Sequence, residues 1–203
     1  MRLLSALKTL QNVGMPIMTT SDAAYALGLE REYASQVLRR LALEKHIVHL
    51  SWGLWVINLQ INPLSIPDYL VAPFPSYVSL QTALYHHGMI DQISRIITVV
   101  SLARTRRIKT PLATISVHHV MPEFFFDYEF DPKTQVKMAT PEKALLDFLY
   151  LKPAKSLWFK SLPEVEISPT FNEKKAFEMI QKIPSPSRRT LVEKGLRSIL
   201  GNT

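Results

Sequence analysis

Residues 21–47 read SDAAYALGLEREYASQVLRRLALEKHI, and this stretch decides the fold of the N-terminal part of the chain. The polar residues at 20–22 are types that cap a helix, and Gly28 is typical of a helix end, so we predict a short helix at 23–27. A longer helix follows, and its apolar residues share one face: Leu29, Ala34, Val37, Leu38 and Leu41. The stretch therefore predicts two consecutive helices separated by a turn that contains glycine.

The sequence on either side adds one more helix and a β-hairpin. Apolar residues recur at helical spacing within 1–12, which predicts a first helix that Gly14 and Pro16 end. After the longer helix, two strand-like runs at 46–50 and 54–59 are joined by Ser51-Trp52-Gly53, and a glycine beside a tight reversal favours a hairpin. We expect Trp55 to pack against this domain and Trp52 to lie at the hairpin tip.

This order of helices and hairpin, and the stretch 21–47 in particular, resembles a winged helix-turn-helix domain. The resemblance implies that the third helix enters the major groove of duplex DNA with its N-terminal residues at base edges. The expected base contacts come from Arg31, Tyr33, Ser35 and Gln36. The expected phosphate contacts come from Arg39 and Arg40. The hairpin tip would be the wing on the backbone or in the minor groove, with His49, Ser51 and Trp52.

Two other interpretations of this first domain stay open. Residues 1–60 carry a net charge of only +2, and Glu30 and Glu32 lie where a phosphate would be repelled. Any solvated helix shows a polar face of this kind, and winged helices also serve as protein-interaction adaptors.

The second part of the chain has a mixed pattern of helices and strands. Four prolines between 62 and 75 predict a linker: Pro63, Pro67, Pro73 and Pro75. Beyond it, the pattern predicts a helix at 76–89, a buried strand at 95–102, further strands at 114–120 and 124–130, and a helix that Thr140 caps and Pro141 begins. The expected fold class is α+β, with a first domain at 1–61 and a mixed α/β C-terminal domain at 62–203.

The C-terminal domain is expected to divide into a helix and strand core at 62–151 and a basic helical tail at 152–203. The tail carries a net charge of +5 out of +7 for the whole chain. Its two helices are predicted at 172–182 and 187–200, with four cations outside: Arg188, Arg189, Lys194 and Arg197. A basic chain favours polyanionic partners, because each phosphate contact releases counterions.

Three stretches of the C-terminal domain resemble AbiE-type antitoxins of type IV toxin–antitoxin systems. They are YVSLQTALYHHGMI (77–90), ITVVSLARTRRIKTPLATISVHHVMPEFFFDYE (97–129) and ATPEKALLDFLYL (139–151), of which the last is the most specific. This family also places a winged helix-turn-helix before the region, so the resemblance covers 1–151.

The resemblance implies two functions for the chain. The N-terminal domain would bind inverted repeats before its own operon as a cooperative dimer and repress transcription, and the C-terminal domain would counter a nucleotidyltransferase-like toxin encoded beside it. The expected partners are therefore double-stranded DNA and that toxin, in a cytoplasmic protein that binds no membrane. No cysteine is present, so thiol catalysis and a disulfide framework are excluded.

A cluster of cations follows the predicted buried strand. Arg104, Arg106, Arg107 and Lys109 must leave the edge of the sheet, and they suit a phosphate backbone or an acidic face of the toxin. A solvated loop is the alternative interpretation.

A metal- or nucleotide-dependent enzyme is the alternative from another functional class. Asp127, Glu129 and Asp131 alternate, so on one strand they would share a face and could hold Mg²⁺. The pairs His86-His87 and His118-His119 would form a metal site only with one histidine from each pair. Because no glycine-rich phosphate loop is present, we expect no enzyme, no cofactor and no metal.

Overall fold

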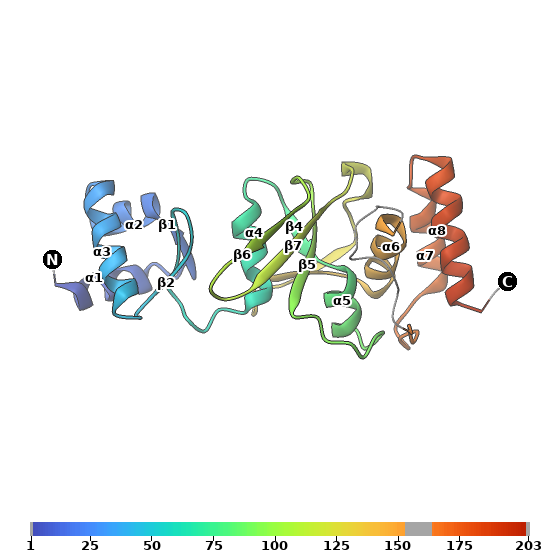
Figure 1. Ribbon diagram of the computed structural model, residues 1–203, viewed down its shortest axis with the longest axis horizontal. Coiled ribbons are helices and arrows are strands. Elements are labelled where there is room, and N and C mark those ends of the chain that lie inside the picture. The colour runs from blue at the N-terminus through green and yellow to red at the C-terminus, as the bar shows by residue number, and fades with distance from the viewer. Residues whose placement is uncertain (1, 153–163, 202–203) are drawn as a thin grey trace. The chain divides into compact units, whose positions relative to one another are not determined.

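The structure, a computed structural model, describes residues 2–152 and 164–201 (Figure 1). These residues form a mixed α+β fold with two β-sheets. The chain divides into two compact units: one contains Met1–Pro63 and Lys109–Ala113, and the other contains Leu64–Ile108 and Thr114–Thr203. Within the described ranges, no helix has both the length and the apolar character needed to cross a membrane.

Three helices dominate the first unit: α1 (Leu3–Asn12), α2 (Thr20–Leu27) and α3 (Arg31–Leu43). Helix α2 begins earlier than the sequence predicts, because Thr19 and not a residue at 20–22 is its N-cap. The Thr19 hydroxyl accepts a hydrogen bond of 3.1 Å from the amide of Asp22, and the Asp22 carboxylate accepts one of 2.9 Å from the amide of Thr19. This reciprocal capping box satisfies two amides that the first turn leaves open. Gly28, at φ 63°, ends α2 as predicted.

The sheet of the first unit has three antiparallel strands in the order β1-β3-β2. They are β1 (Ile17–Thr19), β2 (Val48–Ser51) and β3 (Leu54–Val56). The predicted hairpin is confirmed by β2 and β3, which are shorter than expected. The sequence did not predict β1, which pairs with β3 and is too short to show an alternating pattern.

Apolar residues of all three helices and of the sheet form the core of the first unit. This core includes Leu10 of α1, Ala23 of α2, Leu38 and Leu41 of α3, and Trp55 of β3. The face predicted for α3 is confirmed for Ala34, Val37, Leu38 and Leu41, which are all buried. It was wrong for Leu29, which precedes the helix and is half-buried. The outward face of the same helix is fixed by this packing.

The second unit is built on a six-stranded sheet in the order β6-β7-β5-β4-β9-β8. Its strands are β4 (Ser76–Val78), β5 (Ile96–Ser101), β6 (Arg106–Lys109), β7 (Thr114–His119), β8 (Tyr128–Asp131) and β9 (Val136–Ala139). Pairs β5–β7 and β4–β9 are parallel, whereas β4–β5 and β8–β9 are antiparallel. The strands predicted at 95–102 and 114–120 are confirmed as β5 and β7.

Helical segments of the second unit lie before, between and after the strands. They are the 3-10 helices η1 (Pro63–Ser65) and η2 (Pro122–Phe124), and the α-helices α4 (Ile66–Val71), α5 (Leu80–His86), α6 (Pro141–Leu151), α7 (Glu173–Gln181) and α8 (Pro186–Ile199). Thr140 caps α6 as predicted, since its hydroxyl accepts a hydrogen bond from the amide of Lys143.

Three predictions for this unit were wrong in part. The proline-rich passage is not only a linker: α4 lies within it, because Pro67 occupies the first turn of the helix, where a missing amide hydrogen costs nothing. The segment predicted as one helix at 76–89 begins as strand β4, and only Leu80–His86 is helical. The strand predicted at 124–130 is shorter, since Phe124 belongs to η2 and β8 begins at Tyr128.

The two tail helices pack against α6 and close the core of the second unit. The prediction that the tail arginines all remain outside was wrong for two of them. Arg188 donates a hydrogen bond of 2.8 Å to the carbonyl oxygen of Tyr150, and Arg189 donates one of 2.9 Å to that of Ile183. These side chains therefore hold the tail to the domain. Residues 153–163 and 202–203 of the predicted tail lie outside the described residues.

Candidate nucleic-acid interface

Helix α3 presents a polar face to solvent. Because Ala34, Val37, Leu38 and Leu41 bury the opposite face, the helical period turns the remaining side chains outward. Six predicted site residues lie on this helix, of which five are exposed and Ser35 is half-buried: Arg31, Tyr33, Ser35, Gln36, Arg39 and Arg40. The condition that a recognition helix must meet, an accessible outer face, is fulfilled.

The cations and the amide on this face have no partner within the described part of the chain. The side chains of Arg31, Arg39 and Arg40 form no ion pair there, and that of Gln36 forms no hydrogen bond. A guanidinium carries five N–H donors, so each arginine offers its full donor set to an external acceptor. The face is thus chemically available as well as accessible.

The β2–β3 hairpin carries two tryptophans, of which Trp52 is exposed and Trp55 is buried. Trp52 lies at its tip with 99% of its surface exposed, next to Gly53, whose φ of 73° makes the tight turn. Trp55, two residues further along the chain from Gly53, is 4% exposed, and its indole Nε1 donates a hydrogen bond of 3.0 Å to the Thr20 hydroxyl. The predictions for both tryptophans are confirmed: one anchors the hairpin and the other faces solvent.

A groove of about 850 Å³ separates α3 from the hairpin. Its α3 side is lined by Arg31, Ser35, Gln36 and Arg39, and its hairpin side by His49 and Trp52. The groove therefore brings together most of the residues that the sequence assigned to the recognition helix and the wing. Tyr33, Arg40 and Ser51 are not part of its lining.

The groove also holds Glu32, which the sequence already marked as unfavourable for a phosphate, and Leu43, which the sequence did not single out. Glu32 lies in it beside the two arginines and reduces their positive potential. Leu43, at the end of α3, is 82% exposed although it continues an apolar run. It lies off the buried face of α3, and the helical period counted from Leu38 and Leu41 could have predicted this exposure.

The cationic cluster lies on and beside an edge strand. Arg106, Arg107 and Lys109 belong to β6, so the alternative interpretation of a solvated loop was wrong for these three, and Arg104 precedes that strand. All four side chains are exposed, and Arg106 donates a hydrogen bond of 3.4 Å to the carbonyl oxygen of Leu70. The side chains of the cluster therefore project from the edge of the sheet, as expected, and three of them belong to an extended strand.

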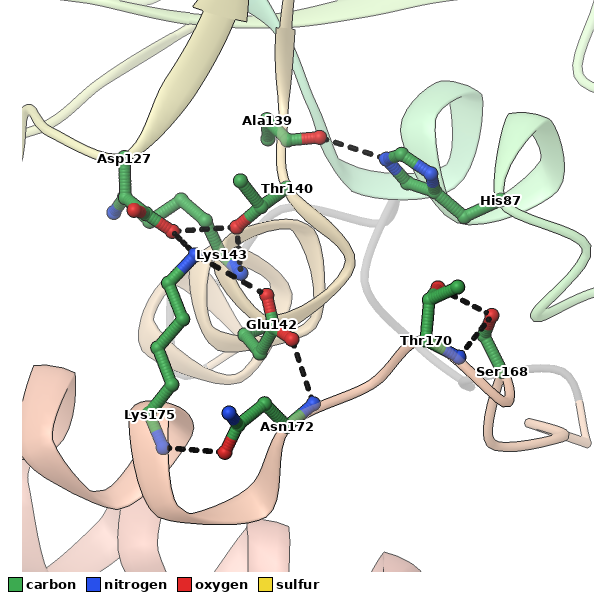
Figure 2. A network of polar contacts seen from close by, with 10 residues as sticks. All are labelled: His87, Asp127, Ala139, Thr140, Glu142, Lys143, Ser168, Thr170, Asn172 and Lys175. Atoms are coloured by element: carbon green, nitrogen blue, oxygen red, sulfur yellow. Dashed lines mark hydrogen bonds and ion pairs between the residues drawn. The ribbon is translucent and has the colours of Figure 1, made fainter.

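Only Glu129 and Asp131 of the enzyme hypothesis lie on the strand, so the three carboxylates do not share one face. Asp127 precedes β8 with a φ of 59°, and its carboxylate accepts a hydrogen bond of 2.5 Å from the Thr140 hydroxyl and lies 3.0 Å from the ammonium of Lys175 (Figure 2). Glu129 and Asp131 are exposed on β8. In the described ranges, no three His, Cys, Asp or Glu side chains are placed to hold a metal ion, so the strand-face interpretation was wrong.

The polar contacts around Asp127 connect the tail to α6. Figure 2 shows Lys175 of α7 reaching Asp127, while the Glu142 carboxylate accepts a hydrogen bond of 2.7 Å from the amide of Asn172. Lys175 also lies 3.6 Å from Glu142. Burial lowers the pKa of the Lys175 ammonium, but the two carboxylates together outweigh it and raise that pKa above its ordinary value. These contacts are structural, because they hold the N-terminal end of α7 in place.

A buried ion pair lies inside α6, in the stretch ATPEKALLD. Lys143 and Asp147 are both fully buried, and the ammonium lies 2.5 Å from the carboxylate and 2.7 Å from the carbonyl oxygen of Phe124. The other carboxylate oxygen accepts hydrogen bonds from Tyr77 at 3.0 Å and from Ser79 at 2.7 Å. Burial lowers the pKa of Lys143 and raises that of Asp147, and the ion pair opposes both shifts. No pattern in the sequence indicates that these two charged side chains are buried.

The two histidines of each pair lie in different surroundings. His87 donates from Nε2 to the carbonyl oxygen of Ala139 over 2.7 Å, which fixes its tautomer (Figure 2). His118 is buried and His119 is exposed, on opposite sides of β7.

No protein-family model matches the chain, and no curated protein matches it either. The interface described above is supported by residues and geometry alone.

Proposed function

We propose that the first unit is a winged helix-turn-helix domain that binds double-stranded DNA. The order of α1, β1, α2, α3 and the β2–β3 hairpin supports this interpretation, because it places a helix with an open polar face beside a projecting loop. One observation carries the proposal: Arg31, Gln36, Arg39 and Arg40 point outward on one helix without a partner in the described chain. Donors arranged in this way suit the acceptors of a groove and its phosphates.

The proposed contacts differ along α3. Arg31 and Gln36 lie in the N-terminal half of the helix, so they are assigned to base edges, guanine for the guanidinium and adenine for the amide. Arg39 and Arg40, one turn further on, are assigned to phosphates. Trp52 at the exposed hairpin tip is assigned to the DNA backbone or the minor groove.

For the whole chain, we propose a transcriptional autorepressor that also acts as an antitoxin against a nucleotidyltransferase-like toxin. This proposal rests on the resemblance of 77–90, 97–129 and 139–151 to AbiE-type antitoxins. The exposed cations at Arg104, Arg106 and Arg107 are the residues of the second unit assigned to the toxin or to phosphate. A neighbouring reading frame for such a toxin, and rescue of growth when both genes are expressed together, are the expected observations.

The DNA proposal is tested with the full chain and a labelled duplex from upstream of its own gene. Fluorescence anisotropy is expected to show tighter binding to this duplex than to a scrambled one. Arg31→Ala and Gln36→Ala should each weaken specific binding by roughly 5- to 150-fold, since a good side-chain-to-base contact contributes about 1–3 kcal/mol. Equal affinity of both variants and the wild type would contradict the assignment of α3.

Two control variants separate this effect from a general loss of charge. Lys8→Ala removes an exposed cation of α1, and the double variant Arg104→Ala/Arg106→Ala removes two cations of the second unit. Both should retain the preference for the upstream duplex over the scrambled one.

A protein-docking adaptor is the second candidate, and one observation favours it. Leu43 at 82% exposure and Trp52 at 99% exposure give the groove an apolar rim, which suits an amphipathic helix of another protein. This second candidate predicts that the wild-type chain binds neither the upstream nor the scrambled duplex, and tighter binding to the upstream duplex would contradict it.

A further inference from the structure

The second unit contains a pocket lined partly by polar side chains, and of these the proposed function uses only Arg107. It has a volume of about 290 Å³ and lies between strands β5, β6 and β7 and the residues that lead into β5. Six of its lining residues carry polar or charged side chains that matter here: Gln81, Gln92, Arg95, Arg107, Ser116 and His118. They come from four separate segments of the chain, so the pocket is formed only by the folded unit.

The charge of this pocket is of one sign. Arg95 and Arg107 are its ionised side chains, and none of its lining residues is an aspartate or a glutamate. Nearby acidic residues line a different hollow, which contains Asp91, Glu164 and Glu166. Arg95 forms no ion pair with any residue of the ranges 2–152 and 164–201. Two guanidinium groups that line one pocket attract an anion.

The floor of the pocket is buried and polar. Ser116 and His118 are two residues apart on β7, so both side chains lie on the same face of the sheet, with 9% and 5% of their surfaces exposed. The Ser116 hydroxyl lies 2.9 Å from Nε2 of His118. When Nε2 carries the ring proton and donates it to the serine oxygen, the serine hydroxyl donates its own proton to a bound acceptor.

His118 supports this arrangement without adding charge. Burial lowers the pKa of its imidazole to about 4, so the ring is neutral at pH 7. The floor therefore offers a neutral hydroxyl, while the rim offers the two cations and the amides of Gln81 and Gln92.

We propose that this pocket binds the phosphate group of a phosphate monoester, with Arg95 and Arg107 as charged donors and Ser116 as a neutral donor from the floor. A phosphate monoester has three oxygens that accept hydrogen bonds, and arginine matches such an oxygen pair with two parallel N–H groups. The volume lies at the small end of ligand pockets, which are about 300–1,000 Å³. It suits one phosphate and an attached sugar, and it is too small for a dinucleotide.

The phosphate has two chemical sources that the experiment distinguishes. Isothermal titration calorimetry is carried out on the full chain with inorganic phosphate, AMP, adenosine, and a short single-stranded oligonucleotide with either a 5′-phosphate or a 5′-hydroxyl. Binding of AMP but not adenosine, with equal affinity for both oligonucleotides, identifies a small free phosphate monoester. Tighter binding of the 5′-phosphorylated oligonucleotide identifies a strand end, and any contribution of the first unit cancels in that comparison.

Substitutions then locate the site. Arg95→Gln and Arg107→Gln should each weaken binding of AMP or of the 5′-phosphorylated strand at least about tenfold, since a charged hydrogen bond is lost. Both side chains are exposed, so the melting temperature should be unchanged. Lys133→Gln, which removes an exposed cation elsewhere in the same unit, should bind as the wild type does.

Two results would overturn the proposal. One is the absence of binding by phosphate, AMP and the phosphorylated strand up to about 5 mM. The other is wild-type affinity in both arginine variants. Neither result bears on the DNA proposal, because the upstream duplex should bind the Arg95→Gln and wild-type chains equally.

Discussion

The indole of Trp55 on β3 donates its hydrogen bond to the hydroxyl of Thr20, the first residue of α2. Both side chains are buried, with 4% and 7% of their residues' surfaces exposed. The bond joins the sheet that carries the hairpin to the helix that precedes α3, and the ring of His49 lies 4.4 Å from that of Trp55. The position of the hairpin beside α3 therefore depends on one buried tryptophan.

Replacing Trp55 should destabilise the first unit. Trp55→Phe retains an aromatic ring but removes the donor to Thr20, and a buried group left without its partner costs about 1–3 kcal/mol. Trp55→Ala should cost about 3–5 kcal/mol, because it also opens a cavity. Urea denaturation of the full chain, followed by circular dichroism, measures both changes.

Trp52 provides the matched comparison, since it is the same residue type at the tip of the same hairpin. Its side chain is 99% exposed, so Trp52→Ala should leave the unfolding free energy within about 0.5 kcal/mol of the wild type. A destabilisation of Trp52→Ala as large as that of Trp55→Ala would show that the hairpin packs differently.

The salt dependence of duplex binding should report the phosphate contacts. Arg39→Ala and Arg40→Ala should each lower the slope of log affinity against log salt concentration by about 1, because each releases one counterion fewer from the DNA. Both variants should weaken binding to specific and scrambled duplexes alike. Titrations at several salt concentrations give the slopes, and an unchanged slope in both variants would remove these residues from the phosphate contacts.

The buried pair Lys143–Asp147 should be sensitive to the loss of either partner. Lys143→Met or Asp147→Asn leaves an internal charge without its counter-charge, and the expected cost is about 3–5 kcal/mol. The double variant Lys143→Met/Asp147→Asn should lose less than the sum of the two single losses. Urea denaturation of all three variants measures the coupling.

A partly exposed pair in the same unit is the control for this cycle. The Lys137 ammonium lies 2.7 Å from the Asp68 carboxylate, and about a third of each side chain is exposed. Lys137→Met should therefore cost below about 1 kcal/mol. An equal effect at Lys137 and Lys143 would mean that burial does not set the cost.

The stability of the second unit should fall on acidification because of His118. Its pKa is about 4 in the folded chain and about 6.5 when unfolded. Above pH 6.5 both states are neutral and the stability is fully present. Below that pH only the unfolded chain takes up the proton, so stability falls until the folded pKa is reached. The expected loss between pH 7 and pH 5 is about 2 kcal/mol.

Urea denaturation at the two pH values should show a weaker pH dependence for His118→Gln by that amount. His119→Gln changes the exposed neighbour and should keep the dependence of the wild type. If His118→Gln kept the full dependence, other groups would be responsible for it.

Local patterns in the sequence were sufficient for the helices and strands with a clear period. The buried face of α3 follows from the spacing of Val37, Leu38 and Leu41, and Thr140 with Pro141 marks the start of α6 correctly. Strand β1 is three residues long and exists because β3 pairs with it, so no local pattern could announce it. Tyr77 is apolar enough for a helix face, but tertiary pairing with β5 places it in β4.

The candidate sites also differ in how far the sequence could predict them. The outward residues of α3 could be predicted, because a helix buried on one side determines its other side. The internal position of Lys143 could not, since lysine is almost never fully buried without a partner, and its partners Asp147 and the carbonyl of Phe124 are defined only after folding. The pocket beside Ser116 and His118 depends on strands that the sequence leaves separate.

The charged edge strand β6 has a consequence for how copies of this chain behave in a crowded solution. An edge strand leaves amides and carbonyls open to one more strand, and this is how sheets polymerise into fibres. A second copy that added its own β6 there would bring Arg106, Arg107 and Lys109 of each chain together, and their mutual repulsion opposes the pairing. The sheet therefore ends at β6, and polymerisation through this edge is suppressed by electrostatic repulsion.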